Sequence, residues 1–423
     1  MNMTIAAPRG RTPLLFLCHR IPYPPNKGDK IRAFHLLHHL AQAFDVHLAT
    51  FIDDPADWAW QGEVEKHCVS SFFAPLSPRR AMLLSLRGLL TGDPLTLPYY
   101  ASRAMKRWVR DTIDAEGIRH VIVYSSAMAQ FLPAGECFSR KVIDFVDIDS
   151  DKWLQYARQK PWPLSWVYRR EGQQLLRYEQ TLARSFDAGL FVSAAEAEHF
   201  RRLSPDTADK IGFYCNGVNA DYFAPGPQHA NPYPEGRRAL VFTGAMDYWP
   251  NVEAVTWFAR AVFPMLQSSY PELVFYVVGG NPSTAVRSLA QNPAVTVTGR
   301  VPDVRPYLNF ALAAVAPMRV ARGIQNKVLE GMAMARPVLV SELGFEGIHD
   351  AGREHVIIAE TAEDYGQAVG ELLSGRYLGL GSGARDYVLR AFNWDDNLPE
   401  VAALLTSATE GEAGDASEVT VHG

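Results

Sequence analysis

Apolar and polar positions along the chain follow two alternating periods. Residues 14–18 form a short, continuous apolar run, which is typical of a buried strand, and residues 46–51 are predicted to be the next strand. Between them, Ile31, Phe34 and Leu37 recur at the spacing of one helical face, so residues 30–43 are predicted to be a helix. A strand, a helix and a second strand in this order indicate a βαβ unit.

The same alternation continues to about residue 214. Short runs rich in β-branched residues predict strands, and the longer stretches between them predict helices. The expected strands cover residues 121–124, 142–145, 188–192 and 211–214, and the expected helices cover residues 104–116 and 167–185.

The pattern stops after Asn216-Gly217, a dipeptide typical of turns. The loop that follows holds the densest group of breaker residues in the chain: Pro225, Gly226, Pro227, Pro232, Pro234 and Gly236. We therefore expect a first domain over residues 1–216.

A second alternation covers residues 217–392, the expected second domain. Strands that alternate with helices of this length predict a parallel sheet covered on both faces. The fold class is therefore α/β, with two doubly wound, Rossmann-like domains that bind ligands in a cleft at the carboxyl ends of their strands. The expected strands are 239–243, 274–278, 295–298, 313–316, 337–341 and 356–358, and the expected helices are 252–266, 327–334 and 362–373.

Composition narrows the class of protein. A chain of 423 residues fits two domains, or at most three. With 48% apolar and 21% charged residues it resembles neither a disordered chain nor a membrane bundle, and no apolar run approaches the ~18 residues of a spanning helix. The first 13 residues carry two arginines without an apolar stretch, and four scattered cysteines lack metal-ligand spacing. We expect a cytoplasmic protein without a secretory signal.

The net charge of −5 is unevenly distributed. Residues 1–216 carry 27 Lys/Arg against 23 Asp/Glu, whereas residues 217–423 carry 14 against 23. The basic first half suits an anionic surface or substrate, and the acidic second half argues against a nucleic-acid-binding protein. Ordinary variation in surface charge is the alternative.

The strongest local signal lies between residues 317 and 340. Arg319, Arg322 and Gly323 occupy a loop ahead of a helix expected to begin near residue 326, and Lys327 and Glu330 fall in its first turns. A helix N-terminus with cations beside it binds pyrophosphate, and a glutamate one turn later can accept hydrogen bonds from ribose hydroxyls. The alternative is a Lys/Glu pair on a solvated helix face.

Residues 323–338 resemble the donor-binding signature of retaining GT-B glycosyltransferases of the large family-four group. Four further motifs of that family have similar counterparts in the same order: residues 23–30 after the first strand, Asn216–Asn219, Phe242–Gly244 and Gly299–Asp303. Residues 242–251 most resemble a subgroup of sugar transferases associated with bacterial exopolysaccharide and exosortase loci.

The resemblance implies a GT-B fold and a sugar-transfer activity. The first domain would bind a glycan or polyprenyl-phosphate-linked acceptor, and the second a nucleotide-diphosphate sugar, UDP- or GDP-linked. Residues 393–409 would form a terminal helix that crosses back to the first domain, ahead of a disordered tail over residues 410–423. Gly28 and Gly244 would contact the donor, and no cofactor is expected.

A metal ion is not expected either. The second half holds no Asp-x-Asp motif of the metal-dependent kind. The charge of the leaving diphosphate would instead be neutralised by Arg319, Arg322, Lys327 and the helix dipole.

The sequence departs from the family pattern at three places. Arg322 stands eight residues before Glu330, where many members carry a first glutamate, and Met246–Trp249 stand where many carry an arginine and a lysine. The histidine found after a strand of the first domain has no counterpart. Asp147 and Asp149 stand there, as candidates to orient the acceptor hydroxyl or the oxocarbenium-like centre. Helix N-capping is the alternative role.

The turn after the first strand offers two more candidates. Gly28 allows a close backbone approach to a ligand, beside the N-terminus of the next helix, although a plain tight turn is the alternative. The loop lacks the G-x-G-x-x-G of nicotinamide dehydrogenases. His19 is interpreted as a loop residue rather than a catalytic base.

Two segments of the first domain indicate contact with a membrane. Residues 79–90 and 153–170 mix arginines and lysines with leucines and tryptophans, the composition that an anionic bilayer surface attracts. We expect peripheral contact with the cytoplasmic face of the inner membrane. Packed helices with charged rims are the alternative.

Two other functions remain open. A nucleotide-sugar 2-epimerase shares the two-domain plan, and an inactive glycosyltransferase-like binding subunit would explain the missing first glutamate.

Overall fold

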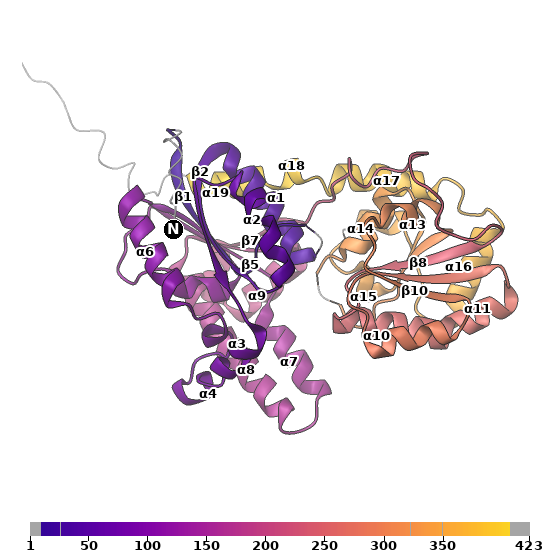
Figure 1. The fold of residues 1–423 in the computed structure, drawn as a ribbon, viewed down its shortest axis with the longest axis horizontal. Helices are drawn as coiled ribbons and strands as arrows, with labels where there is room; N and C mark the ends of the chain where they lie inside the picture. The colour runs from indigo at the N-terminus through magenta and orange to yellow at the C-terminus, as the bar shows by residue number, and fades with distance from the viewer. Residues whose placement is uncertain (1–9, 26, 322, 349, 407–423) are drawn as a thin grey trace, which may run out of the picture. The chain divides into compact units, whose positions relative to one another are not determined.

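The computed structural model describes residues 10–406 except residues 26, 322 and 349. The chain divides into two compact units (Figure 1). The first ends at Tyr214 and also takes in the segment from Leu398 onward, and the second covers Cys215–Asn397. The breaker-rich loop that follows Asn216-Gly217 in the sequence therefore lies inside the second unit.

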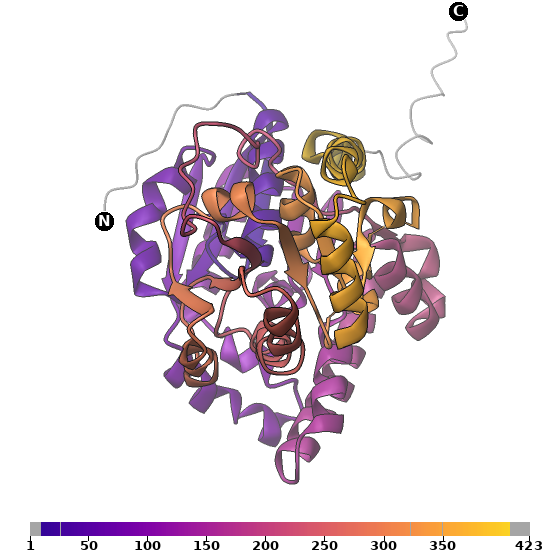
Figure 2. The same ribbon diagram turned by 90° about the vertical axis from the view of Figure 1, so that its right-hand side faces the viewer.

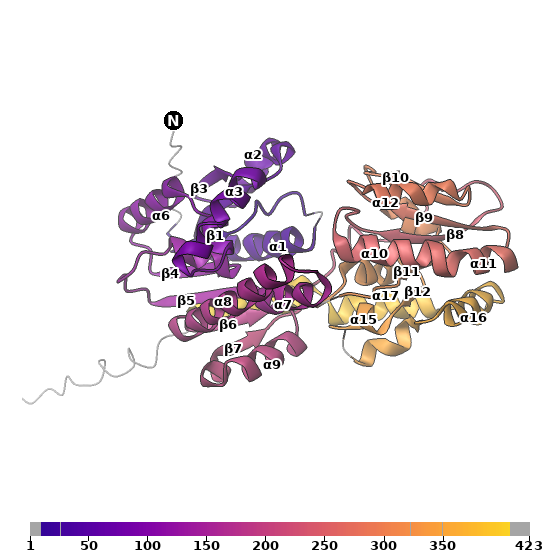
Figure 3. The same ribbon diagram turned by 90° about the horizontal axis from the view of Figure 1, so that it is seen from below.

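The first unit contains a seven-stranded parallel sheet in the order β3-β2-β1-β4-β5-β6-β7 (Figure 3). The interior strand β1 pairs with β2 and β4, so that Phe16 lies opposite Leu48 and Ile122. The strands are β1 (Thr12–Cys18), β2 (Phe44–Ile52), β3 (Ser70–Pro75), β4 (His120–Tyr124), β5 (Arg140–Val146), β6 (Ala188–Phe191) and β7 (Ile211–Phe213).

Helices connect these strands. The expected helices are present, but the one expected from residue 167 begins three residues earlier, as α8. The α-helices are α1 (Gly28–Ala43), α2 (Gln61–Glu65), α3 (Pro78–Ser85), α4 (Gly88–Thr91), α5 (Thr96–Tyr99), α6 (Arg103–Glu116), α7 (Asp149–Gln159), α8 (Leu164–Ser185) and α9 (Ala194–Leu203), with 3-10 turns at Pro55–Trp60, Ser126–Phe131 and Pro205–Lys210.

The sequence pattern missed strand β3. This strand lies at the edge of the sheet and most of its residues are only half-buried. An edge strand needs no continuous apolar run. Because β3 begins with the polar residues Ser70 and Ser71, its sequence does not show the apolar pattern of a buried strand.

The second unit contains a six-stranded parallel sheet in the order β10-β9-β8-β11-β12-β13 (Figures 2 and 3). All the strands expected between residues 239 and 358 are present. Their bounds are β8 (Arg238–Thr243), β9 (Leu273–Val278), β10 (Val295–Gly299), β11 (Ala313–Ala316), β12 (Val338–Val340) and β13 (Ile357–Ile358).

The helix expected over residues 252–266 is interrupted. It consists of α10 (Trp249–Trp257), a π-helical turn (Phe258–Val262) and α11 (Phe263–Ser269). Pro264 has no N–H to donate to the previous turn, which accounts for the irregular stretch before it. The other helices are α12 (Thr284–Arg287), α13 (Arg305–Phe310), α14 (Asn326–Ala333), α15 (Glu342–Phe345), α16 (Ala362–Leu373), α17 (Leu380–Ala391) and α18 (Trp394–Asn397), with 3-10 turns at Ser288–Gln291 and Asp350–His355.

The C-terminal segment returns to the first unit, as expected, although not as one helix. Helix α18 still belongs to the second unit, and α19 (Pro399–Thr406) packs against β4 and β5 of the first. Pro399 opens α19 and separates it from α18, because proline suits the first turn of a helix but not its interior. The expected tail over residues 410–423 lies outside the described residues.

Within the described part of the chain, no helix combines the length and the apolar character that crossing a membrane requires.

Candidate functional site

Lys327 lies where two strands of the second sheet end. Helix α14 begins at Asn326, two residues after Ile324, and Gly323 adopts a φ of +62° that favours glycine in the turn before it. The Lys327 Nζ lies 3.1 Å from Gln325 Oε1, 4.0 Å from Met318 Sδ and 5.3 Å from the centre of the Phe242 ring. The ammonium group is therefore fixed between the ends of β8 and β11.

Burial shifts both titratable groups of this helix start toward their neutral forms. It lowers the pKa of Lys327 to about 8 and raises the pKa of Glu330 to about 7, and the charge of each partner partly opposes the shift of the other. Both side chains are partly buried, so the pair does not lie on a fully solvated helix face. Lys327 is also the only lysine after residue 210.

Gly244 occupies a tightly packed turn after β8. Its φ is +153°, and a Cβ atom there would lie 2.8 Å from Asn251 Nδ2. A Cβ on Gly279, at the end of β9, would lie 1.7 Å from the Gly244 carbonyl oxygen. Asn251 fixes this turn because its side chain donates a hydrogen bond to the Ala245 carbonyl (2.9 Å), a role that the sequence analysis missed.

Arg319 faces α10. Its Nε lies 3.4 Å from Glu253 Oε1, and its guanidinium lies 5.2 Å from the Trp257 ring centre. It lines a cavity of about 400 Å³ with Met318, Ser341 and Thr361. No contact among the described residues joins Arg319 to Lys327. Arg322, the third expected cation of this loop, lies outside the described residues.

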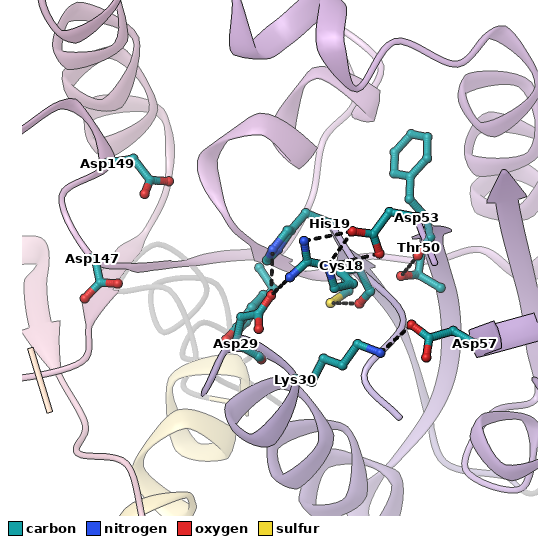
Figure 4. Close-up of polar contacts among 12 residues, drawn as sticks. Cys18, His19, Asp29, Lys30, Thr50, Asp53, Asp57, Asp147 and Asp149 are labelled. Carbon is teal, nitrogen blue, oxygen red and sulfur yellow. Dashed lines mark hydrogen bonds and ion pairs between the residues drawn. The ribbon is translucent and has the colours of Figure 1, made fainter. Parts of the chain in front are cut away.

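Asp147 follows the end of β5 in the first unit, and Asp149 is the first residue of α7 (Figure 4). Both carboxylates contact the Lys152 ammonium, at 2.8 Å and 3.2 Å. Ile148 occupies the N-cap position of α7 and Asp149 opens its first turn, so neither aspartate side chain caps this helix. Both carboxylates remain partly exposed.

The backbone that carries the two aspartates is strained and firmly held. Val146 has a φ of +70°, which a β-branched residue rarely adopts, and the Asp147 N–H donates to the Phe145 carbonyl across it (3.0 Å). Such strain persists only where the surroundings enforce the conformation.

Three buried carboxylates provide that support. They accept hydrogen bonds from alternate backbone N–H groups: Asp144 from Val146 (3.0 Å), Glu196 from Ile148 (3.0 Å) and Glu179 from Ser150 (3.2 Å). Asp144 is itself neutralised by Arg32, which is fully buried on α1. Sequence reasoning missed these residues, since each appears as an ordinary charge on a strand or helix.

Gly28 is the first residue of α1, two residues before the predicted start of this helix, beside a network of charges at the ends of β1 and β2 (Figure 4). Asp29 accepts hydrogen bonds from Arg20 (2.5 Å), and Arg20 also binds Asp53. Although burial acts to raise it, the hydrogen bond from His19 and the charge of Arg20 hold the pKa of Asp29 well below its usual range.

His19 belongs to this network. Its Nε2 lies 3.4 Å from Asp29, and its ring stacks on Tyr124. Its Nδ1 is buried without a hydrogen-bond partner among the described residues. The ring is thus enclosed beside Asp29, an arrangement that suits a loop residue better than an exposed base.

Comparison with known proteins bears most directly on the second unit, which carries Gly244, Arg319, Lys327 and Glu330. Residues 237–375 match the family model Glycosyl transferases group 1. The match spans all of these residues and the strands that position them. No curated protein sequence matches the chain.

Solved structures resemble most of the chain. Sucrose-phosphate synthase from Thermosynechococcus elongatus has a TM-score of 0.69 at 17% identity, over 93% of this chain and 98% of that one. HepE from Anabaena, solved with UDP-glucose, has a TM-score of 0.65 at 13% identity, over 94% and 100%. WaaG, a glycosyltransferase involved in lipopolysaccharide biosynthesis, has 0.62 at 14%, over 93% and 100%. The fold is GT-B, with two Rossmann-like domains, as the sequence motifs predicted.

Proposed function

We propose that this protein is a glycosyltransferase that moves a sugar from a UDP- or GDP-linked donor to a glycan or lipid-linked acceptor. The observation that carries the proposal is Lys327, held at the start of α14 between the ends of β8 and β11, inside the segment that matches a glycosyltransferase family. A cation at a helix N-terminus suits a diphosphate. HepE, of similar fold, was solved with UDP-glucose.

The first unit would bind the acceptor. Asp147 and Asp149 stand at the carboxyl end of β5, where doubly wound sheets bind ligands, and their backbone is held by buried groups. We assign them to orienting the acceptor hydroxyl or to stabilising positive charge on the sugar ring.

The stereochemical course and the metal requirement are further parts of the proposal. We propose transfer with retention, as the family resemblance implies. We also propose that Arg319, Arg322, Lys327 and the α14 dipole neutralise the leaving diphosphate in place of a metal ion.

The biological setting is a further part of the proposal. The motif at residues 242–251 suggests bacterial exopolysaccharide synthesis, on the cytoplasmic face of the inner membrane, with a polyprenyl-phosphate-linked acceptor. WaaG, which has a similar fold, is involved in lipopolysaccharide biosynthesis.

A donor-turnover assay tests the activity. The full chain is incubated with a panel of UDP- and GDP-sugars, and the nucleotide and sugar products are resolved by chromatography. A transferase releases the nucleoside diphosphate, slowly with water and faster with acceptor. Interconversion of the donor sugar would instead indicate a 2-epimerase, and an intact donor throughout would indicate an inactive binding subunit.

A further inference from the structure

Exposed apolar side chains are concentrated in two short segments of the first unit. Among the described residues, 17 large apolar side chains are exposed, and eight of them fall within residues 82–90 and 162–166. Leu90 is 91% exposed and Trp162 is 81% exposed. The eight are Met82, Leu83, Leu86, Leu89, Leu90, Trp162, Leu164 and Trp166.

The structure brings these two segments together. Arg170 of α8 donates hydrogen bonds to the Gly88 carbonyl (2.6 Å) and to the Asp93 carbonyl (3.2 Å), at the two ends of α4. Trp166 lies one helical turn, about 6 Å, before Arg170. Figures 1 and 2 show α3, α4 and the α7–α8 hairpin gathered at one end of the first unit.

A second set of hydrogen bonds fixes the same contact between the two segments. The buried Glu171 carboxylate accepts hydrogen bonds from the backbone N–H groups of Leu95 (2.6 Å) and Thr96 (3.0 Å), just after α4. The two apolar segments, which lie about 70 residues apart in the sequence, therefore form one surface. We call residues 78–92 and 158–170 together the basic–apolar face.

Positive charge accompanies the apolar side chains on this face. Residues 78–92 and 158–170 contain seven arginines and lysines and no aspartate or glutamate. Six of these cations are exposed, and within the described part of the chain none of the six forms an ion pair. They are Arg79, Arg80, Arg87, Arg158, Lys160 and Arg169.

We propose that the basic–apolar face docks on the surface of an anionic phospholipid bilayer. Leucines and tryptophans enter the boundary between headgroups and acyl chains, and the six unpaired cations meet the lipid phosphates. A symmetric dimer fits less well, because an isologous contact would bring this face onto its own copy and place like charges together. Membrane docking does not require the proposed function. The two are linked only because a lipid-linked acceptor would lie in the same bilayer surface.

The test is cosedimentation of the full chain with vesicles, without donor or acceptor. We expect binding to phosphatidylglycerol vesicles that weakens as salt shortens the screening length, ~8 Å at physiological strength, and little binding to phosphatidylcholine vesicles. Arg79→Gln, Arg80→Gln and Arg87→Gln combined should weaken binding by about tenfold or more. The matched control changes three exposed arginines of α6 in the same unit, Arg103, Arg107 and Arg110, to glutamine.

A second pair of variants tests the apolar part. Leu83→Ser with Leu90→Ser should weaken vesicle binding, whereas Leu378→Ser, an equally exposed leucine of the second unit, should not. Equal binding of the Arg79/Arg80/Arg87 variant and the Arg103/Arg107/Arg110 variant to the vesicles, or no binding by the parent chain, would overturn the proposal. The proposal would also be overturned if the parent chain formed a dimer and the Leu83→Ser, Leu90→Ser variant were a monomer. Donor turnover is measured separately, so a chain that binds vesicles but turns over no donor would fail only the proposed function.

Discussion

At the scale of single residues, Lys327 is the one lysine that the sequence of the second unit contains. No lysine follows Lys327, and none lies between it and residue 210, so the only ammonium group of the second unit stands at the start of α14. Burial lowers the pKa of Lys327 to about 8, and a diphosphate beside it would favour the protonated form. Donor binding and the charge of this residue should therefore be coupled.

Lys327→Ala should weaken binding of the nucleotide-diphosphate donor by ~1.5 to 3 kcal/mol, the range for a hydrogen bond to a charged group. Calorimetric titration with UDP and GDP measures this directly. Arg238→Ala is the matched control, because this exposed cation lies at the opposite, amino end of β8. An unchanged dissociation constant in Lys327→Ala would contradict the donor-site assignment.

Glu330→Ala should weaken donor binding and transfer while leaving the fold intact.

At the scale of elements, the turn from β5 into α7 is shaped by distant carboxylates. Glu179 of α8 is fully buried and accepts hydrogen bonds from both the N–H and the hydroxyl of Ser150. Burial raises the pKa of Glu179 to about 8, although the Ser150 hydrogen bonds oppose the shift. Through these two hydrogen bonds Glu179 helps to hold the turn that carries Asp147 and Asp149.

This shift predicts a dependence of stability on pH. Between pH 4.5, the ordinary value for glutamate, and pH 8, the folded state keeps a proton that the unfolded state has released. The unfolding free energy of the first unit should therefore fall as pH rises through this window, by no more than about 1.4 kcal/mol per pH unit. Glu179→Gln, which cannot lose a proton, should reduce this slope.

Hydrogen exchange of peptides covering residues 145–152, measured from pH 5 to pH 8 and corrected for intrinsic rates, reports the local effect. Glu198→Gln serves as the control, because Glu198 is exposed and its ion pairs among the described residues are with arginines of its own helix. Identical slopes in the parent and Glu179→Gln would show that Glu179 does not hold the turn.

At the scale of the whole molecule, the first unit is completed by the end of the described chain. Helix α19 packs on β4 and β5, and Leu398, Val401 and Leu405 are buried there. The sheet of the first unit is thus covered in part by residues that lie almost 200 positions beyond its last strand. The stability of the first unit should therefore depend on these C-terminal residues.

Leu405→Ala should destabilise the first unit by about 2 to 5 kcal/mol, the usual cost of truncating a buried leucine. Leu404→Ala, at a half-buried neighbouring position, should cost less. Urea unfolding of the full chain, followed by hydrogen exchange in β4 and β5, locates the loss. Destabilisation confined to the second unit would contradict the placement of α19.

Activity of the whole enzyme should survive EDTA. The proposed donor site assigns the diphosphate charge to Arg319, Arg322, Lys327 and a helix dipole rather than to a divalent ion. Donor turnover measured with EDTA and with added magnesium or manganese checks this expectation. A strict requirement for either metal would mean that the diphosphate site is wrongly assigned.

The sequence alone determined the alternation of strands and helices, the α/β class and the GT-B fold. Buried parallel strands are rich in apolar residues, and the proposed donor loop has its glycine and cations within a few neighbouring positions, so both leave local signals. The tertiary structure decided what depends on residues far apart in the chain. The edge strand β3, the support of Val146 by Asp144, Glu179 and Glu196, and the union of residues 78–92 with 158–170 have no local signature. Their partners are adjacent only after folding, and a buried carboxylate looks the same in a sequence as an exposed one.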